Sequence, residues 1–313
     1  MTRRTALVTG ASRGIGKAAA IHLARAGFDV ALAARTATEG EAREHSSTVR
    51  RSDTTPLPGS LASTQALVEA EGAQALPVVA DLLDPASLGV AVTTVLQQWG
   101  HIDLLLNNAR YVGPGHMDRL LDTPIPLIQD HLNANVIAPL ILCKLLLPSM
   151  IERGSGQIVN MTSLSAYSTS RKAAGDGGWG LGYGMSKAAM HRIAGILAVE
   201  TEGTGVQVIN IDPGSIATER IAQDMGSFGF SGGAPADVIG AVLAWLGTHP
   251  EEAAQFNGET IPAQHFCHEH GLLPGWDGPQ ATTDRVRYDR IGAVMDDLGR
   301  ALRDDANLPT IPR

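Results

Sequence analysis

The chain has 313 residues with a net charge of −8 at pH 7, and 44% of its residues are hydrophobic. This apolar fraction is enough for a core, and the 35 glycines follow no period of three, which excludes a disordered or collagen-like chain. The acidic balance lacks the basic surface that binds phosphate backbones, so we expect no nucleic-acid partner.

The sequence also bears on the compartment. The first ten residues reach Gly10 after only a short apolar run, too short for a signal peptide. The most apolar stretch, residues 139–148, is interrupted by Lys144 and is shorter than a membrane span, so we expect no membrane association. Cys143 and Cys267 are too few for a disulfide framework. We therefore expect a cytoplasmic protein.

Short aliphatic runs alternate with stretches of helical apolar spacing along the chain. Strands are predicted at residues 5–9, 29–33, 76–79, 102–106, 157–160, 206–211 and 259–261. Helices are predicted at residues 15–26, 63–71, 85–99, 126–151, 183–201 and 235–246. This alternation predicts an α/β fold, a Rossmann-type doubly wound parallel sheet of about seven strands between two helix layers. Ligands of such sheets bind beyond the carboxyl ends of the strands.

Three predicted loops are unusually long, at residues 36–61, 165–182 and 219–233, and loops of this length in a compact domain are usually functional or mobile. The last of them holds the apolar residues Met225, Phe228 and Phe230, which we interpret as a substrate lid.

The chain is predicted to hold one Rossmann domain and an extension. The domain covers residues 1–263, and residues 264–313 form a C-terminal extension that packs on the same or a neighbouring subunit. Within the extension, an amphipathic stripe suitable for such docking is formed by Ile291, Met295, Leu298 and Leu302.

A glycine-rich turn follows the first predicted strand. Gly10, Gly14 and Gly16 allow a tight turn and a close approach of the backbone to a pyrophosphate, which then meets the free N–H groups at the start of a helix. An ordinary strand-to-helix turn can also be rich in glycine. The position after the first strand of a βαβ unit favours dinucleotide binding.

The TGxxxGxG spacing of this turn resembles the classical short-chain dehydrogenase/reductase family, and the resemblance extends over about residues 5–262. It implies that Asp81 contacts the adenine. The run 107–109 matches the family's NNAG motif, except that Arg110 replaces the glycine, and residues 213–218 match PGxxxT, which holds the nicotinamide. The resemblance implies a cofactor site formed by Gly10, Ser12, Arg13, Gly14, Ile15, Gly16, Arg35, Asp81, Leu82, Asn108, Ala109, Tyr183, Lys187, Pro213, Gly214, Ile216 and Thr218.

The end of the second strand bears on the choice between the two nicotinamide cofactors. A carboxylate there would bind the ribose hydroxyls of NAD and repel a 2′-phosphate. The chain has Ala34 followed by Arg35 instead, and a guanidinium accepts a phosphate through charge-assisted bonds. Arg13 could approach the same phosphate from the glycine turn. The sequence therefore predicts NADP(H).

Tyr183 and Lys187 are four residues apart in a predicted helix, so their side chains share a face. A phenol has a pKa of about 10 in water, and a nearby ammonium and the positive nicotinamide ring favour the phenolate. Tyr183 is therefore the candidate general acid/base. The resemblance implies that Ser163 hydrogen-bonds the substrate oxygen and that the backbone of Asn135 holds a water linking Lys187 to solvent.

Residues 265–270 hold three histidines and Cys267, a tract that can bind zinc, but the spacing matches no standard finger and we predict no metal. The whole pattern predicts an NADP(H)-dependent oxidoreductase that interconverts a carbonyl compound and an alcohol, with an apolar small-molecule substrate. The family resemblance implies a homo-oligomer, a tetramer or dimer. Two alternatives stay open: a catalytically silent NADP-binding sensor or scaffold, and a nucleotide-sugar epimerase or dehydratase.

Overall fold

A computed structural model of the chain describes residues 3–170, 172–220 and 232–279. Met1–Trp276 form one compact unit, and the unit that follows lies almost entirely outside the described residues. The predicted stripe at Ile291, Met295, Leu298 and Leu302 and the predicted lid residues Met225, Phe228 and Phe230 are also outside them.

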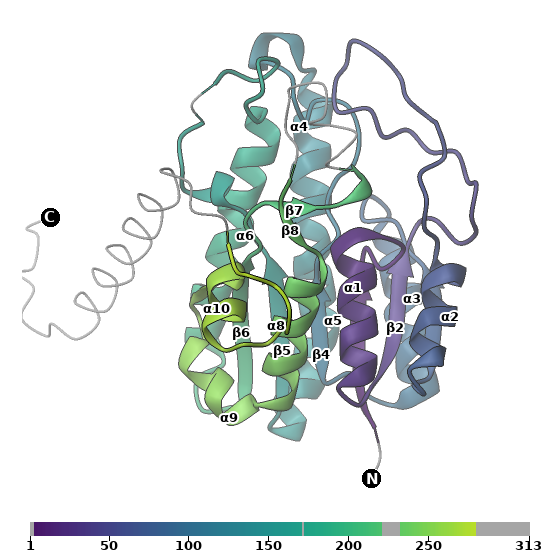
Figure 1. Cartoon of the computed structure of the whole chain (residues 1–313), viewed down its shortest axis with the longest axis vertical. Helices are drawn as coiled ribbons and strands as arrows, with labels where there is room; N and C mark the ends of the chain where they lie inside the picture. The colour runs from purple at the N-terminus through teal and green to yellow at the C-terminus, as the bar shows by residue number, and fades with distance from the viewer. Residues whose placement is uncertain (1–2, 171, 221–231, 280–313) are drawn as a thin grey trace, which may run out of the picture. The chain divides into compact units, whose positions relative to one another are not determined.

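The centre of the first unit is a seven-stranded parallel sheet with the strand order β3-β2-β1-β4-β5-β6-β9 (Figure 1). Its strands are β1 (Arg4–Thr9), β2 (Phe28–Ala34), β3 (Ala75–Val79), β4 (Leu104–Asn107), β5 (Gly156–Met161), β6 (Val206–Asp212) and β9 (Thr260–Pro262). The predicted Rossmann-type fold is confirmed. From β1 the chain adds strands first toward one edge of the sheet, as β2 and β3, and then toward the other, beginning with β4. The point between β1 and β4 where this direction changes opens a crevice at the carboxyl ends of the strands.

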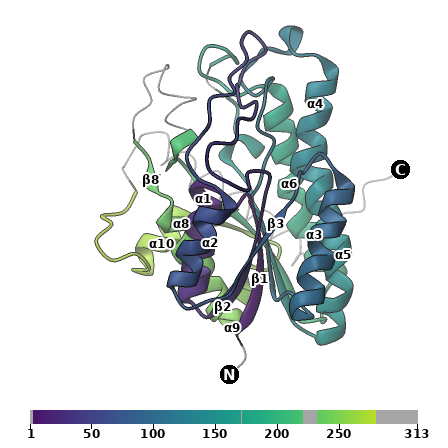
Figure 2. The same ribbon diagram turned by 90° about the vertical axis from the view of Figure 1, so that its right-hand side faces the viewer.

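Helices cover both faces of the sheet. They are α1 (Gly14–Arg25), α2 (Leu61–Ala70), α3 (Pro85–Trp99), α4 (Ile125–Leu132), α5 (Ala138–Arg153), α6 (Leu181–Glu200), α8 (Asp237–Thr248), α9 (Pro250–Ala253) and α10 (Ala263–Glu269). Figure 2 shows α1, α2 and α8 on one side of the sheet and α3, α5 and α6 on the other. Two short strands, β7 (Ile216–Ala217) and β8 (Ala234–Pro235), pair separately.

The strands alternate their side chains between two apolar clusters. On β4, Leu104 and Leu106 pack in the cluster beneath α1 and α8, whereas Leu105 packs in the cluster beneath α3 and α5. Successive side chains of a strand point to opposite faces, so a strand covered on both sides must be apolar throughout. This explains why the strands read as continuous aliphatic runs.

The helix predicted over residues 126–151 is interrupted. A π-helical turn at Asn133–Ile137 separates α4 from α5. By length and composition the whole stretch Ile125–Arg153 could cross a membrane. In the structure, α5 packs against α3 and β5 and buries Leu142, Leu146 and Met150, so packing on the sheet accounts for its apolar side.

The segment between β2 and α2, residues 35–60, extends past the strand ends and is here called the β2–α2 segment. Buried Asp118 holds it: one carboxylate oxygen accepts a hydrogen bond from Thr48 Oγ1 (2.6 Å), and the other accepts one from the N–H of Val49 (2.8 Å). The backbone N–H of Met117 also donates to the Ser47 carbonyl (2.8 Å). The segment is thereby tied to the chain that follows β4.

Candidate active site

A cavity of about 380 Å³ opens at the carboxyl ends of the strands. It brings together most of the residues that the sequence assigns to the site. These are Gly10, Ser12, Arg13, Gly14, Ile15, Arg35, Asp81, Leu82, Asn108, Ala109, Ser163, Tyr183, Lys187, Pro213, Gly214, Ile216 and Thr218. Gly16 and Asn135 do not line it.

The glycine turn approaches its neighbours too closely for side chains. A Cβ on Gly16 would lie 2.1 Å from the Gly10 carbonyl oxygen, and one on Gly10 would lie 2.8 Å from the Asn108 amide nitrogen. Arg13, the residue before α1, does not cap the helix with its side chain, so no capping side chain occupies the first N–H groups of α1. The turn and the helix start therefore form a backbone cradle suited to a pyrophosphate.

Thr9 fixes the segment that follows β4 against this turn. Its hydroxyl accepts hydrogen bonds from the N–H groups of Asn108 and Ala109, both 3.0 Å, and donates to the Leu106 carbonyl at 3.0 Å. The Asn108 amide donates in return to the Thr9 carbonyl (2.9 Å). The two motifs that the sequence separates by a hundred residues thus form one rigid wall.

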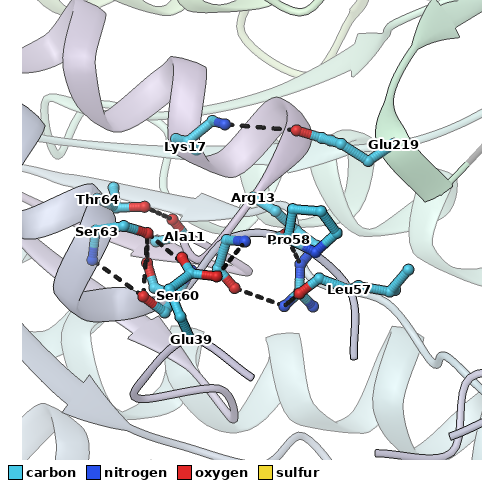
Figure 3. Close-up of polar contacts among 11 residues, drawn as sticks. Ala11, Arg13, Lys17, Glu39, Leu57, Pro58, Ser60, Ser63, Thr64 and Glu219 are labelled. Atoms are coloured by element: carbon cyan, nitrogen blue, oxygen red, sulfur yellow. Dashed lines mark hydrogen bonds and ion pairs between the residues drawn. The ribbon is translucent and has the colours of Figure 1, made fainter. Parts of the chain in front are cut away.

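Arg35 and Arg13, the residues expected to meet a ribose phosphate, have different surroundings. Arg35 is half-exposed, and its guanidinium lies 3.9 Å from the Asp81 carboxylate. Arg13 donates to the carbonyl oxygens of residues 57–59 in the β2–α2 segment, with distances of 2.6–3.2 Å (Figure 3). Arg13 therefore holds this segment against the glycine turn.

Other side chains of the β2–α2 segment line the same cavity. They are Thr36, Glu41, Arg43, Glu44, His45, Thr55 and Leu57. The Arg43 guanidinium donates to the Arg35 carbonyl oxygen (2.8 Å) and pairs with Glu41 (2.7 Å). Sequence reasoning recognised the segment as long but could not place it, because its path depends on contacts with residues far along the chain.

Tyr183 and Lys187 lie on the first turns of α6 and are both buried. The Lys187 ammonium donates to the Met161 carbonyl oxygen at the end of β5 (2.6 Å). Burial and then the charge of Arg110 lower the pKa of Lys187 to about 7, although Asp212 opposes the shift. A lysine in this range exchanges its proton near neutral pH.

Ser163 directly follows β5 and precedes a short 3₁₀ turn. Its hydroxyl accepts hydrogen bonds from the N–H of Ser165 (3.2 Å) and from the Ser165 hydroxyl (3.1 Å), and it faces the cavity. β5 therefore brings Ser163 to the cavity that Tyr183 reaches from α6.

Asn135 lies in the π-helical turn, behind the cavity wall. Its side-chain oxygen accepts from the N–H of Tyr111 (2.6 Å), and its amide donates to the Ser186 hydroxyl (2.9 Å). Ser186 in turn donates to the Tyr183 carbonyl (2.9 Å). Asn135 thus connects the segment after β4 to the turn of α6 that carries Tyr183.

Two aromatic side chains that sequence reasoning did not assign to the site pack against Tyr183. The His116 ring packs edge-on at 4.4 Å between centroids, and Trp179 lies at 5.2 Å. The backbone N–H of Gly180 donates to the His116 carbonyl (2.9 Å), which joins the long 165–182 loop to the segment after β4. No sequence signal pointed to His116, because the coil that holds it follows no local pattern.

Arg110 adds a positive charge to this wall. Its guanidinium carbon lies 5.8 Å from the centroid of the Tyr183 ring. Burial and then this charge lower the pKa of His131 to about 4 and hold that of His116 well below its usual range. Both imidazoles are therefore neutral at pH 7.

The histidine tract near residue 265 forms α10. Cys267 is buried without a disulfide, and the His270 ring stacks on Phe266 with centroids 4.0 Å apart. Within residues 3–170, 172–220 and 232–279, no group of three or more His, Cys, Asp or Glu side chains could hold a metal ion.

The family model described as "short chain dehydrogenase" matches the chain over residues 4–66 and 58–225. A short chain dehydrogenase of Pseudocercospora fijiensis is 34% identical over 224 residues, which is 71% of this chain and 62% of that protein, less than two thirds of its length. The 1-deoxy-11-beta-hydroxypentalenate dehydrogenase of Streptomyces exfoliatus is 30% identical over 249 residues, 78% of this chain and 80% of that protein.

Solved structures share the fold. A 3-oxoacyl (acyl-carrier-protein) reductase from Agrobacterium tumefaciens with NADP bound superposes with a TM-score of 0.66 at 24% identity, over 83% of this chain and 93% of that one. A short chain dehydrogenase from Mycobacterium paratuberculosis bound to NAD has a TM-score of 0.65 at 22% identity, over 83% and 95% of the two chains. These two structures hold different nicotinamide cofactors on the same fold.

Proposed function

The chain belongs to the short-chain dehydrogenase/reductase family, and we propose that it interconverts a carbonyl compound and its alcohol with NADP(H). The observation that carries the proposal is the meeting of two sets of residues at one cavity. The glycine turn at the start of α1 lines one part, and Ser163, Tyr183 and Lys187 line another.

The cavity fits a nicotinamide dinucleotide. The turn has no room for a Cβ at Gly10 or Gly16, and the uncapped start of α1 suits a pyrophosphate. Pro213, Gly214 and Thr218 would hold the nicotinamide end. When bound, this cofactor supplies or accepts the hydride of the reaction.

The proton chemistry falls to this chain's own side chains. Tyr183 donates a proton from its phenol to the carbonyl oxygen, or takes one from the alcohol in reverse. Ser163 donates a hydrogen bond to the same oxygen and orients it. The ammonium form of Lys187 stabilises the phenolate that remains on Tyr183.

The preference for NADP(H) is proposed from the end of β2. Ala34 is the last residue of this strand and carries no carboxylate that would repel a 2′-phosphate. Arg35, with a half-exposed guanidinium, is the next residue, and the Arg43 guanidinium donates a hydrogen bond to the Arg35 carbonyl oxygen. Two guanidinium groups at this end of the cavity favour a phosphate ester.

We also propose a homo-oligomer, a dimer or tetramer, assembled through α5 and α6. Leu145 on α5 is exposed, and so are Ile196 and Val199 on α6. Apolar side chains gathered on two neighbouring helices are typical of an interface between subunits.

NADPH oxidation with a panel of aldehydes and ketones tests the proposed reaction, with Tyr183→Phe as the matched variant. Phenylalanine keeps the ring but removes the proton donor, so we expect kcat/KM to fall at least about a hundredfold. Cofactor binding, measured by NADPH fluorescence, should change little. Cofactor binding without turnover of any panel member would contradict the proposal, and so would turnover that Tyr183→Phe leaves intact.

A further inference from the structure

Arg110 stands where the family motif has glycine, and its backbone does not need one. No non-glycine residue in the described ranges has a positive φ, so an arginine fits the local conformation without strain. The side chain reaches the cavity instead of pointing to bulk solvent. The substitution therefore adds a functional group to the wall of the site.

The Arg110 guanidinium has an unusual environment. It is partly buried and donates one hydrogen bond, from Nη1 to the Tyr111 carbonyl (3.0 Å). Among the residues that the structure describes, no carboxylate pairs with it, while Lys187 and two histidines lie near. A guanidinium has five N–H donors. A guanidinium that lies partly desolvated in a cavity wall without a counter-ion is suited to bind an anion there.

His116 supplies a polar atom beside the same phenol. It is 1% exposed, and its Nδ1 has no hydrogen-bond partner among the described residues. A neutral imidazole carries one donor and one acceptor nitrogen. Trp179, packed at 5.2 Å from both His116 and Tyr183, adds an apolar face to this side of the cavity.

We infer that Arg110, His116 and Trp179 form a substrate subsite for a carboxylate on an apolar body, next to the carbonyl that Tyr183 protonates. This inference rests on the proposed function and names its substrate class: oxo acids and the matching hydroxy acids. The planar guanidinium pairs with a carboxylate in a bidentate manner. Because Arg110 lies over the Tyr183 ring, the carboxylate is only a few bonds from the reacting carbon.

Two substrate pairs test the subsite on the full chain: benzoylformate against its methyl ester, and levulinate against its methyl ester. Each pair keeps the ketone and replaces the charged carboxylate with a neutral methyl ester. For at least one pair we expect kcat/KM of wild-type protein to favour the acid by about tenfold or more. Arg110→Gln should remove this preference by weakening turnover of the acid much more than that of the ester, and Arg110→Lys should restore part of it.

Arg50→Gln is the matched control, because Arg50 is exposed, pairs with Asp122 and does not line the cavity. It should leave the acid-to-ester ratio unchanged. His116→Phe keeps an aromatic ring and removes the polar atoms, so it should lower kcat/KM for the acid more than for the ester. A ratio near one in wild-type protein for both pairs would overturn the subsite, and so would a ratio that Arg110→Gln does not change. A rise in KM for NADPH alone would make Arg110 a cofactor ligand instead.

A binding measurement separates this inference from the proposed function. Titration calorimetry of benzoylformate and its ester into the protein saturated with NADP⁺ reads the subsite without turnover. Acid binding that depends on Arg110, together with no turnover of any carbonyl, would keep the subsite and reject the reaction. Turnover of neutral ketones together with equal binding of acid and ester would keep the reaction and reject the subsite.

Discussion

The residues proposed to carry the chemistry were the most predictable part of the candidate site. The Tyr183–Lys187 spacing places both on one helix face, and Ser163 follows a strand whose end defines the cavity. Arg110 was visible as a departure from a motif, but its contact with the Tyr183 ring was not. His116 could not be found, because it lies in a coil whose path no local pattern determines.

Cofactor preference is tested at the end of β2. Ala34→Asp combined with Arg35→Ala places a carboxylate where a 2′-phosphate would bind and removes one guanidinium. We expect the NADPH-to-NADH ratio of kcat/KM to fall by about tenfold or more, because the new charge repels the phosphate and accepts ribose hydroxyls. The ratio is measured with one carbonyl substrate and both cofactors. An unchanged ratio would refute the assignment.

The buried Lys187 predicts a pH dependence of stability. Its pKa is about 7 in the folded chain against an ordinary 10.5, so between these values the unfolded state binds more protons. Stability due to this residue therefore rises as pH increases from about 7 toward 10. In Lys187→Met this rise is absent. The unfolding free energy of wild-type protein, measured with urea at several pH values, should therefore increase relative to that of the variant as the pH rises. Exposed Lys144→Met is the control, and a constant difference between wild-type protein and Lys187→Met would contradict the prediction.

At the scale of elements, the seven strands were predicted because burial on both faces demands aliphatic runs. The π-helical turn at Asn133–Ile137 was not, because its sequence suits an α-helix equally well. It accompanies the placement of Asn135, whose side chain ties the segment after β4 to α6. A π-helical turn inside a helical stretch often marks a functional site. Tertiary contacts, not local propensity, decided this detail.

One buried carboxylate anchors the middle of the β2–α2 segment. Asp118 is 3% exposed and accepts hydrogen bonds from Thr48, Val49 and Gly115. Asp118→Ala leaves the buried Gly115 N–H and the partly buried Val49 N–H without a partner, so we expect a loss of about 3 kcal/mol in unfolding free energy. Hydrogen exchange at residues 44–50 should accelerate.

Asp122→Ala serves as its control, because Asp122 is half-exposed and pairs only loosely with Arg50, at 3.4 Å. That variant should leave the exchange rates of the segment unchanged. Equal exchange in Asp118→Ala and wild-type protein would show that the segment is held by other contacts, such as those of Arg13 with residues 57–59.

At the scale of the whole molecule, the strand order places the site. The reversal between β1 and β4 opens the crevice in which the glycine turn, the residues after β4 and α6 meet. The sequence alone predicted this arrangement, because parallel strands end at one edge of the sheet. The side proposed for the substrate was less predictable, since the 165–182 loop and the segment after β4 line it.

Transfer of a deuteride from the cofactor to a carbonyl carbon tests the proposed reaction. NADPH carrying deuterium in place of both hydrogens at the reducing carbon of its nicotinamide is incubated with the protein and the carbonyl compound that it turns over best. Mass spectrometry of the alcohol should show a single deuterium on the former carbonyl carbon, formed far more slowly by Tyr183→Phe. An alcohol without the label, or no alcohol from any carbonyl compound, would contradict the account.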